Sequence, residues 1–124
     1  MFGFLAASLA AATGAQGASL SGTWRVSGVI HAGRVFFSAS PVCTFRQSGG
    51  QIAGACTGPN ATGPASGTVI GNRVSWNWSH VATTARGITS VTNFNGVVIS
   101  SRMIRGTMTS PDLPGYAGAF TQVR

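Results

Sequence analysis

The chain of 124 residues contains no lysine, and Asp112 is its only acidic residue. It also has only two cysteines and two histidines. A single carboxylate side chain cannot form the carboxylate pairs that many acid–base catalysts use, and so few ligands give no recognisable zinc site. We therefore expect a protein that is not an enzyme and that has no catalytic residue, no metal and no cofactor.

Positive charge has almost nothing to balance it. Eight arginines against one acid give a formal net charge of +7, which favours weak attraction to anionic surfaces. The arginines are scattered and no nucleic-acid-binding motif is present, so specific binding of nucleic acid is not expected. The favoured interpretation is that the arginine excess reflects genome composition and that the charge only aids solubility.

Residues 1–18, MFGFLAASLAAATGAQGA, form the one long apolar run. The run is short for a membrane span and ends in small residues, as a secretory signal peptide does, although no basic residue precedes it. We expect residues 1–18 to be a signal peptide, residues 19–124 to form one domain, and the protein to be exported, either periplasmic or secreted. The alternative is a helix that packs on the domain.

The two cysteines bracket the stretch CTFRQSGGQIAGAC at residues 43–56. If Gly49-Gly50 is a two-residue hairpin loop, Cys43 faces Cys56 at a non-hydrogen-bonded pair, with Cα atoms about 4.5 Å apart. That separation lies within disulfide range. The spacing excludes a Cys-x-x-Cys redox pair, so the pattern predicts a cross-strand disulfide.

The same counting predicts further hairpins. A loop at Ala32-Gly33 would pair Ile30 with Val35, and a loop at Gly71-Asn72 would pair Gly67 with Trp76. The segment 110–114 would join two strands with Met108 opposite Tyr116. A loop near Ser100-Ser101 fits the pattern better than one at Asn95-Gly96. The expected strands are 22–31, 34–47, 51–57, 65–70, 73–82, 87–99, 102–109 and 115–123.

These registers place apolar residues on one face and Arg25, Arg46, Arg73 and Arg105 on the other. They also place Gly28, Gly54 and Gly67 opposite the rings of Phe37, Phe45 and Trp76, where a bare backbone lets a sheet bend. Eight strands joined mostly by short turns predict an all-β fold. We expect an eight-stranded antiparallel up-and-down meander barrel with one cross-strand disulfide.

Short motifs in this chain resemble the lipocalin and avidin group of small barrels. SGTW at 21–24 is similar to their opening strand, GTVIGNRVSWNW at 67–78 looks like the Trp-bearing hairpin of avidins, and FTQV at 120–123 is similar to their closing strand. The chain also resembles uncharacterised exported bacterial barrels with a hairpin disulfide. The likeness implies the barrel but not biotin, because Val26 and Gly118 stand where an avidin-like site has Asn and Asp.

Successive turns alternate between the two barrel ends, so the longer loops gather at one end, which we expect to be the mouth. Trp24 would plug the opposite end. An apolar cup with a few polar groups is typical of a small-molecule site. The candidate ligand-binding residues are Phe37, Trp78, His80, Ser90, Met108, Tyr116, Arg34 and Arg86.

The expected function is an exported binding module for a small apolar or anionic ligand at the long-loop end. The apolar part follows from Phe37, Trp78 and Met108, and the anionic part from Arg34 and Arg86. The alternatives are a protein-binding module, such as a protease-inhibitor-like barrel, and a structural envelope protein with a filled core.

Overall fold

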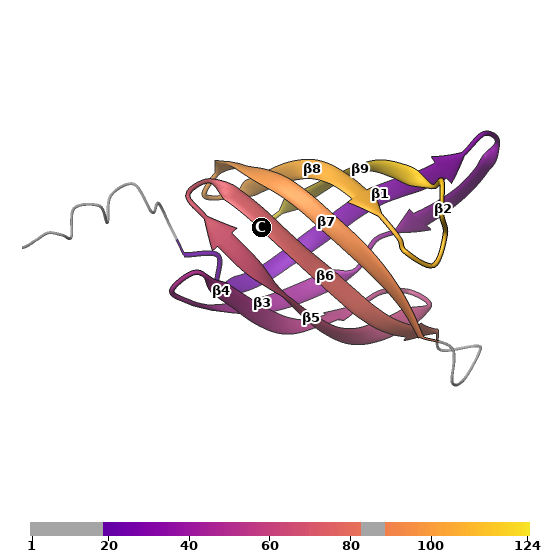
Figure 1. The fold of residues 1–124 in the computed structure, drawn as a ribbon. Helices are drawn as coiled ribbons and strands as arrows, with labels where there is room; N and C mark the ends of the chain where they lie inside the picture. The colour runs from indigo at the N-terminus through magenta and orange to yellow at the C-terminus, as the bar shows by residue number, and fades with distance from the viewer. Residues whose placement is uncertain (1–18, 83–88) are drawn as a thin grey trace, which may run out of the picture.

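A computed structural model describes residues 19–82 and 89–124 of the chain. Every regular element in these two ranges is a β-strand (Figure 1). The strands are β1 (Gly22–Ala32), β2 (Val35–Ala39), β3 (Val42–Ser48), β4 (Gln51–Thr57), β5 (Ala61–Ile70), β6 (Arg73–Ala82), β7 (Thr89–Ser100), β8 (Met103–Thr109) and β9 (Ala117–Val123). Within these ranges no helix has the length and hydropathy needed to cross a bilayer. The expected signal peptide, residues 1–18, lies outside the described residues.

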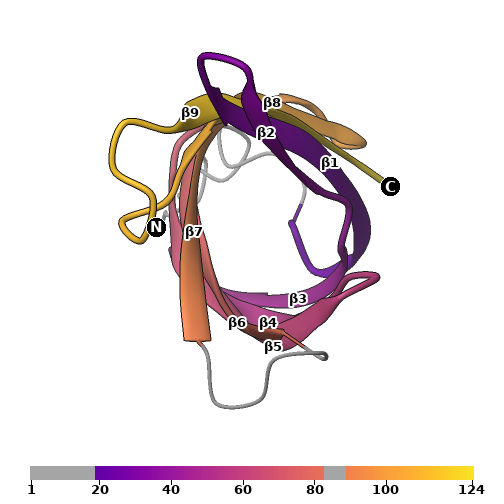
Figure 2. The same cartoon turned by 90° about the vertical axis from the view of Figure 1, so that its right-hand side faces the viewer.

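The strands form one antiparallel sheet that closes on itself. Strands β3 to β9 follow one another in order, and β9 pairs with β1, which also pairs with β3. Viewed along its axis, the sheet is a ring (Figure 2). The prediction of an eight-stranded antiparallel meander barrel is confirmed, with β2 added outside the ring of eight. Closure leaves the eight barrel strands without a free edge along most of their length.

β2 and β3 are two halves of the predicted strand 34–47. Both keep one register against β1, with Gly28 opposite Ala39 and Trp24 opposite Cys43. Pro41 lies between them and has no N–H to give to β1, so the ladder is interrupted there. Pro41 still accepts a hydrogen bond of 2.9 Å from the Val26 N–H. The tip of the β1–β2 hairpin therefore projects from one end of the barrel (Figure 1).

Two of the predicted hairpin registers are confirmed, and so is the preferred position of the turn that follows β7. Cys43 faces Cys56 in β3–β4, and Gly67 faces Trp76 in β5–β6. β7 runs through Asn95-Gly96 to Ser100 and turns at Ser101-Arg102, so the turn near residues 100–101 is the observed one.

Two other predicted registers were wrong by two residues. Ala32 pairs with Val35, so the first loop is Gly33-Arg34 and Ile30 faces Phe37. Gly33 has φ of 60°, and a loop at Ala32-Gly33 would have forced a positive φ on Ala32, which its Cβ disfavours. In β8–β9, Met108 faces Gly118 and not Tyr116, because the connecting loop is longer than expected.

The expected glycine–ring pairs are correct at two of the three positions. Gly54 faces Phe45 and Gly67 faces Trp76. Gly28 faces Ala39 in β2 and Phe120 in β9, so its predicted pairing with Phe37 was wrong. The cause is the two-residue error in the β1–β2 register.

The tight-turn end of the barrel is closed by side chains, as expected for Trp24. The Trp24 ring is fully buried, and its Nε1–H donates to the Leu20 carbonyl at 2.9 Å. The Arg124 guanidinium lies 4.4 Å from the centre of that ring, which suits a cation–π contact. Arg124 also donates to the carbonyl oxygens of Ser19, Ser21 and Ser101. Both ends of the described chain are thus fastened at this floor.

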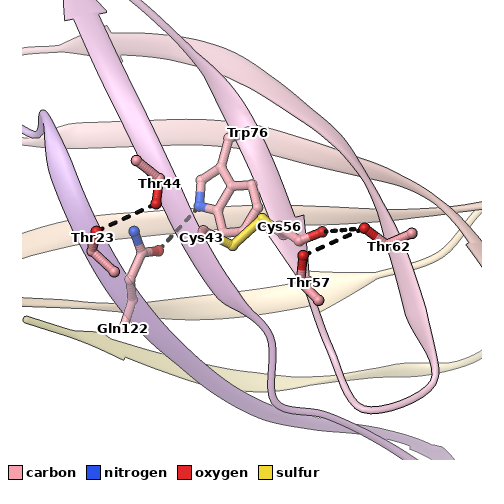
Figure 3. The surroundings of a disulfide bond; sticks show 8 residues. All are labelled: Thr23, Cys43, Thr44, Cys56, Thr57, Thr62, Trp76 and Gln122. Carbon is pink, nitrogen blue, oxygen red and sulfur yellow. Dashed lines mark hydrogen bonds between the residues drawn. A yellow bond between two sulfur atoms is a disulfide. The ribbon is translucent and has the colours of Figure 1, made fainter.

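Above the floor lies a column of stacked aromatic rings. Trp76 stacks on Phe94 at 4.0 Å between ring centres, and Phe45 and Phe120 meet them edge to face. Trp76 Nε1–H donates to the Oε1 of Gln122, a buried amide, at 3.2 Å (Figure 3). This part of the interior is filled by the protein's own side chains.

The predicted disulfide is present. Cys43 and Cys56 are joined with Cα atoms 4.0 Å apart, and both side chains are buried (Figure 3). The bond crosses β3–β4 one pair before the ladder ends at Val42–Thr57. The arginines predicted on the outer face, at positions 25, 46, 73 and 105, are all exposed.

Candidate functional site

A cavity of about 590 Å³ opens at the long-loop end of the barrel. Its wall comes from the β1–β2 hairpin, the end of β6, the start of β7, the end of β8, and the loops 58–60 and 110–116. The volume falls in the range of small-molecule sites. The interior is therefore filled by side chains at the floor and hollow at the mouth. The cavity opens at the end where we expected the mouth from the sequence.

The cavity exists because the wall is incomplete at one corner. β4 ends at Thr57, opposite Val42, and the chain then turns back into β5 through Gly58–Asn60. Gly58 N–H donates to the Ala61 carbonyl at 2.7 Å and tightens this turn. β2 continues past that point with only β1 as a neighbour. Residues 38–40 line the cavity on one side of the gap, and residues 58–61 line it on the other.

One side of the cavity is apolar. Ile30 and Met108 are buried in the wall, and Leu113 packs on the core from the loop 110–116. Phe37 lines the cavity but remains 48% exposed, with its ring 5.6 Å from that of Tyr116. A half-exposed aromatic ring at a cavity mouth leaves apolar area for a ligand to cover.

The opposite side carries polar groups on β6 and β7. His80 Nε2 lies 3.1 Å from Thr92 Oγ1, and Ser90 faces His80 across the strand pair. Partial burial of the ring lowers the pKa of His80, and the Asp112 carboxylate opposes this shift. His80 is therefore neutral at neutral pH, and it hydrogen-bonds Thr92 rather than Ser90.

Asp112 fastens the loop 110–116 to β7. Its Oδ2 accepts the Val91 N–H at 2.7 Å, while Ser110 Oγ donates to the Val91 carbonyl at 2.6 Å. Two further turns within the loop, at Leu113 and Tyr116, hold its shape. These bonds place Ser110, Asp112 and Leu113 on the cavity wall.

Trp78 lies next to His80 on β6 and also lines the cavity. Its ring is 3% exposed, and its centre is 4.2 Å from that of His80. Its Nε1 is buried and has no hydrogen-bond partner among residues 19–82 and 89–124. An unpaired buried donor is costly, by about 1–3 kcal/mol. The unpaired Nε1–H of Trp78 is thus an unfavourable feature of the cavity wall.

The structure brings most of the predicted site residues together. Phe37, Trp78, His80, Ser90 and Met108 line the cavity. Tyr116 packs against Phe37 beside the lining, and Arg34 is exposed in the β1–β2 turn and does not line it. Arg86 lies outside the described residues.

Sequence reasoning missed the contribution of the loop 110–116 and of residues 58–61. Asp112 was not among the expected ligand-binding residues, but it lines the cavity. The segment 57–64 was expected to be a long loop, whereas β5 already begins at Ala61. The alternating pattern of Ala61, Gly63 and Ala65 is the signal that could have extended the strand.

In the described part of the chain, no three His, Cys, Asp or Glu side chains gather in a way that could hold a metal ion. What the cavity wall offers is apolar contact area, one carboxylate, one neutral imidazole and several hydroxyl groups. Such a wall can bind and orient a small molecule. No protein-family model matches the chain, and no curated protein sequence matches it significantly.

Proposed function

We propose that the protein is an exported binding module that takes up a small, mainly apolar molecule at the long-loop end of its barrel. The proposal assigns it to the lipocalin and avidin type of barrel, in which one ligand occupies the mouth. The observation that carries it is the cavity of about 590 Å³ lined by Phe37, Trp78 and Met108. A barrel with a purely structural role would have no need of a cavity of this size.

Export is supported by the disulfide. Disulfides persist in oxidising compartments such as the periplasm and the extracellular space, and are rare in the cytosol. Both cysteines of the chain are used in the Cys43–Cys56 bond. The apolar residues 1–18 would supply the export signal.

The test is binding of a neutral apolar fluorophore, N-phenyl-1-naphthylamine, to the folded domain. The variant Ala39→Trp places a large ring in the cavity, because Ala39 lines it. Ala55→Trp, on the exposed outer face of β4, is the matched control. We expect wild type and Ala55→Trp to bind the dye and Ala39→Trp to lose it. Equal binding by all three proteins would place the dye elsewhere and contradict the proposal.

A second candidate function is protein binding, and the free edge of β2 favours it. The bond from the Val26 N–H to the Pro41 carbonyl fixes the alternation of the ladder. By that alternation, the backbone groups of Phe36 and Ser38 point away from β1, toward the side where β2 has no neighbour. Phe36 is also 62% exposed. An unpaired strand edge with exposed apolar side chains is a template for another strand.

The partner that fits this edge is an extended, acidic segment of another protein. A net charge of +7 and Arg34 at the hairpin turn oppose a second copy of this chain and favour acidic residues. Ser38→Pro tests the idea, because proline removes an outward N–H that the barrel does not use. A synthetic Val-Glu repeat peptide should bind wild type and not Ser38→Pro. Ser38→Ala, which removes the same hydroxyl group but keeps the outward N–H, is the matched control and should still bind the peptide.

A further inference from the structure

We infer that the ligand carries a protonated amine at the Asp112 side of the cavity, so that it is a cationic amphiphile and not an anion. The inference rests on the proposed function, because it concerns the ligand of the same cavity. It names the charge of the ligand's polar group and the residue that recognises it.

The arrangement of fixed charge supports this reversal of sign. Asp112 is the only acidic residue of the chain, and it lines the cavity. Within residues 19–82 and 89–124, no arginine lines the cavity. Arg25, Arg46, Arg73 and Arg105 face outward, and Arg124 is held at the floor. The chain as a whole is strongly basic, whereas the one formal charge on this described cavity wall is negative.

Asp112 is held in place with capacity for a further partner. Its Oδ2 accepts the Val91 N–H, and its own N–H donates to Ser110 Oγ at 3.3 Å. Its Oδ1 makes no hydrogen bond to any described residue, and the side chain is exposed at the cavity mouth. A carboxylate that keeps a free oxygen and is already oriented by the backbone can accept a charged donor without reordering the loop.

The neighbouring groups also suit a cation. An ammonium group has three donors and no acceptor, so it needs oxygen or ring faces around it. Ser90 and Ser110 supply hydroxyl oxygens in the same cavity, and Phe37 supplies an aromatic face. His80 is neutral at neutral pH, because burial lowers its pKa, and therefore does not repel a cation. The remaining wall is apolar and fits an alkyl chain.

The experiment compares three probes that share a dodecyl chain: dodecylamine, 1-dodecanol and dodecanoate. Their affinities are measured at pH 7 by displacement of N-phenyl-1-naphthylamine, below the concentrations at which they aggregate. We expect dodecylamine to bind about tenfold more tightly than dodecanol, as one charge-assisted hydrogen bond would give. Dodecanoate should bind most weakly, because the carboxylate of Asp112 repels it.

Asp112→Asn isolates the charge, because asparagine keeps an oxygen that can accept the Val91 N–H. In this variant the advantage of dodecylamine should vanish, while dodecanol binding stays unchanged. Arg105→Gln, on the outer face, changes the net charge by one unit in the opposite direction and should leave the order of affinities intact, which shows that the net charge alone does not set it.

Each outcome separates this inference from the proposed function. Tightest binding of dodecanoate, or an amine preference that survives Asp112→Asn, overturns the inference while the cavity remains a ligand site. Failure of all three probes and of the dye overturns the proposed function as well. Loss of dodecanol binding in Asp112→Asn would mean that the variant has disturbed the loop. The carboxylate would then have a structural role only, which also contradicts the inference.

Discussion

Two tryptophans on β6 allow the value of one buried hydrogen bond to be measured by identical substitutions. Trp76 and Trp78 are 2% and 3% exposed, and both point into the barrel. They differ in their hydrogen bonding: Trp76 Nε1–H has a partner in Gln122, and Trp78 Nε1 has none in the described structure. Replacing each by phenylalanine removes the same atoms from two different hydrogen-bonding situations.

The expected free energies of unfolding follow from these situations. Either change loses apolar area worth about 1 kcal/mol. Trp76→Phe also leaves Gln122 Oε1 buried without its donor, at about 1–3 kcal/mol, so the protein should lose about 2–4 kcal/mol. Trp78→Phe instead removes an unpaired donor, which offsets the lost area. We expect Trp78→Phe to be neutral or to stabilise the protein by up to about 2 kcal/mol.

The assay is equilibrium unfolding by urea, with the disulfide intact. A double-mutant cycle makes it specific: Gln122→Met alone should destabilise the protein by leaving Trp76 Nε1 unpaired. The double variant Trp76→Phe/Gln122→Met leaves neither partner unpaired, so it should lose about 2–6 kcal/mol less than the sum of the single changes. Additive single effects, or equal losses for Trp76→Phe and Trp78→Phe, would refute the reasoning.

Three further predictions concern the rest of the barrel. Gly54→Ala should destabilise the protein by about 1–3 kcal/mol in urea unfolding, because its Cβ would press on the Thr44 carbonyl; a neutral result would contradict the close strand approach at this position. The free energy of unfolding should fall as the pH drops below about 6.5. Below that pH the histidine is protonated in the unfolded chain, whereas the lowered pKa of His80 disfavours protonation in the folded protein. Just above that pH the free energy of unfolding should not change with pH. His80→Gln should remove the pH dependence; an unchanged pH profile in the variant would show that another group causes it. The pair Cys43→Ser/Cys56→Ser should lose about 3 kcal/mol, with amide hydrogen exchange rising most at the end of the β3–β4 ladder next to these residues. A uniform rise in exchange would argue against local fraying.

The barrel itself was predictable from the sequence because side-chain alternation determines which face of a strand is buried. An error of two residues keeps every side chain on its predicted face, whereas an error of one inverts them all. The β1–β2 and β8–β9 registers were each wrong by two, and Ile30 and Met108 are nevertheless buried as expected. Alternation alone cannot distinguish such registers. Loop chemistry decides between them, as Gly33 does.

The candidate site was predictable in part for the same reason. Phe37, Trp78 and Met108 were correctly expected at the mouth, because their strands and the strand faces on which they lie were predicted correctly. Asp112 was not recognised as a cavity residue, because its position depends on a loop conformation held by bonds to Val91. No periodic pattern encodes such a bond. The sequence also gave no measure of how much space the side chains would leave.

The position of the disulfide explains how a barrel with an incomplete wall stays closed. The β3–β4 ladder ends at Val42–Thr57. Beyond this pair, residues 38–40 and 58–61 line the cavity and do not pair with one another. A ladder frays most readily from an end at which the next pairs are missing. Cys43–Cys56 is the first pair inside that end, so the covalent bond lies where opening would start. Trp24, which faces Cys43 across the β1–β3 pair, and Arg124 close the floor without a covalent bond. The covalent bond thus stands beside the gap in the wall at which the cavity opens.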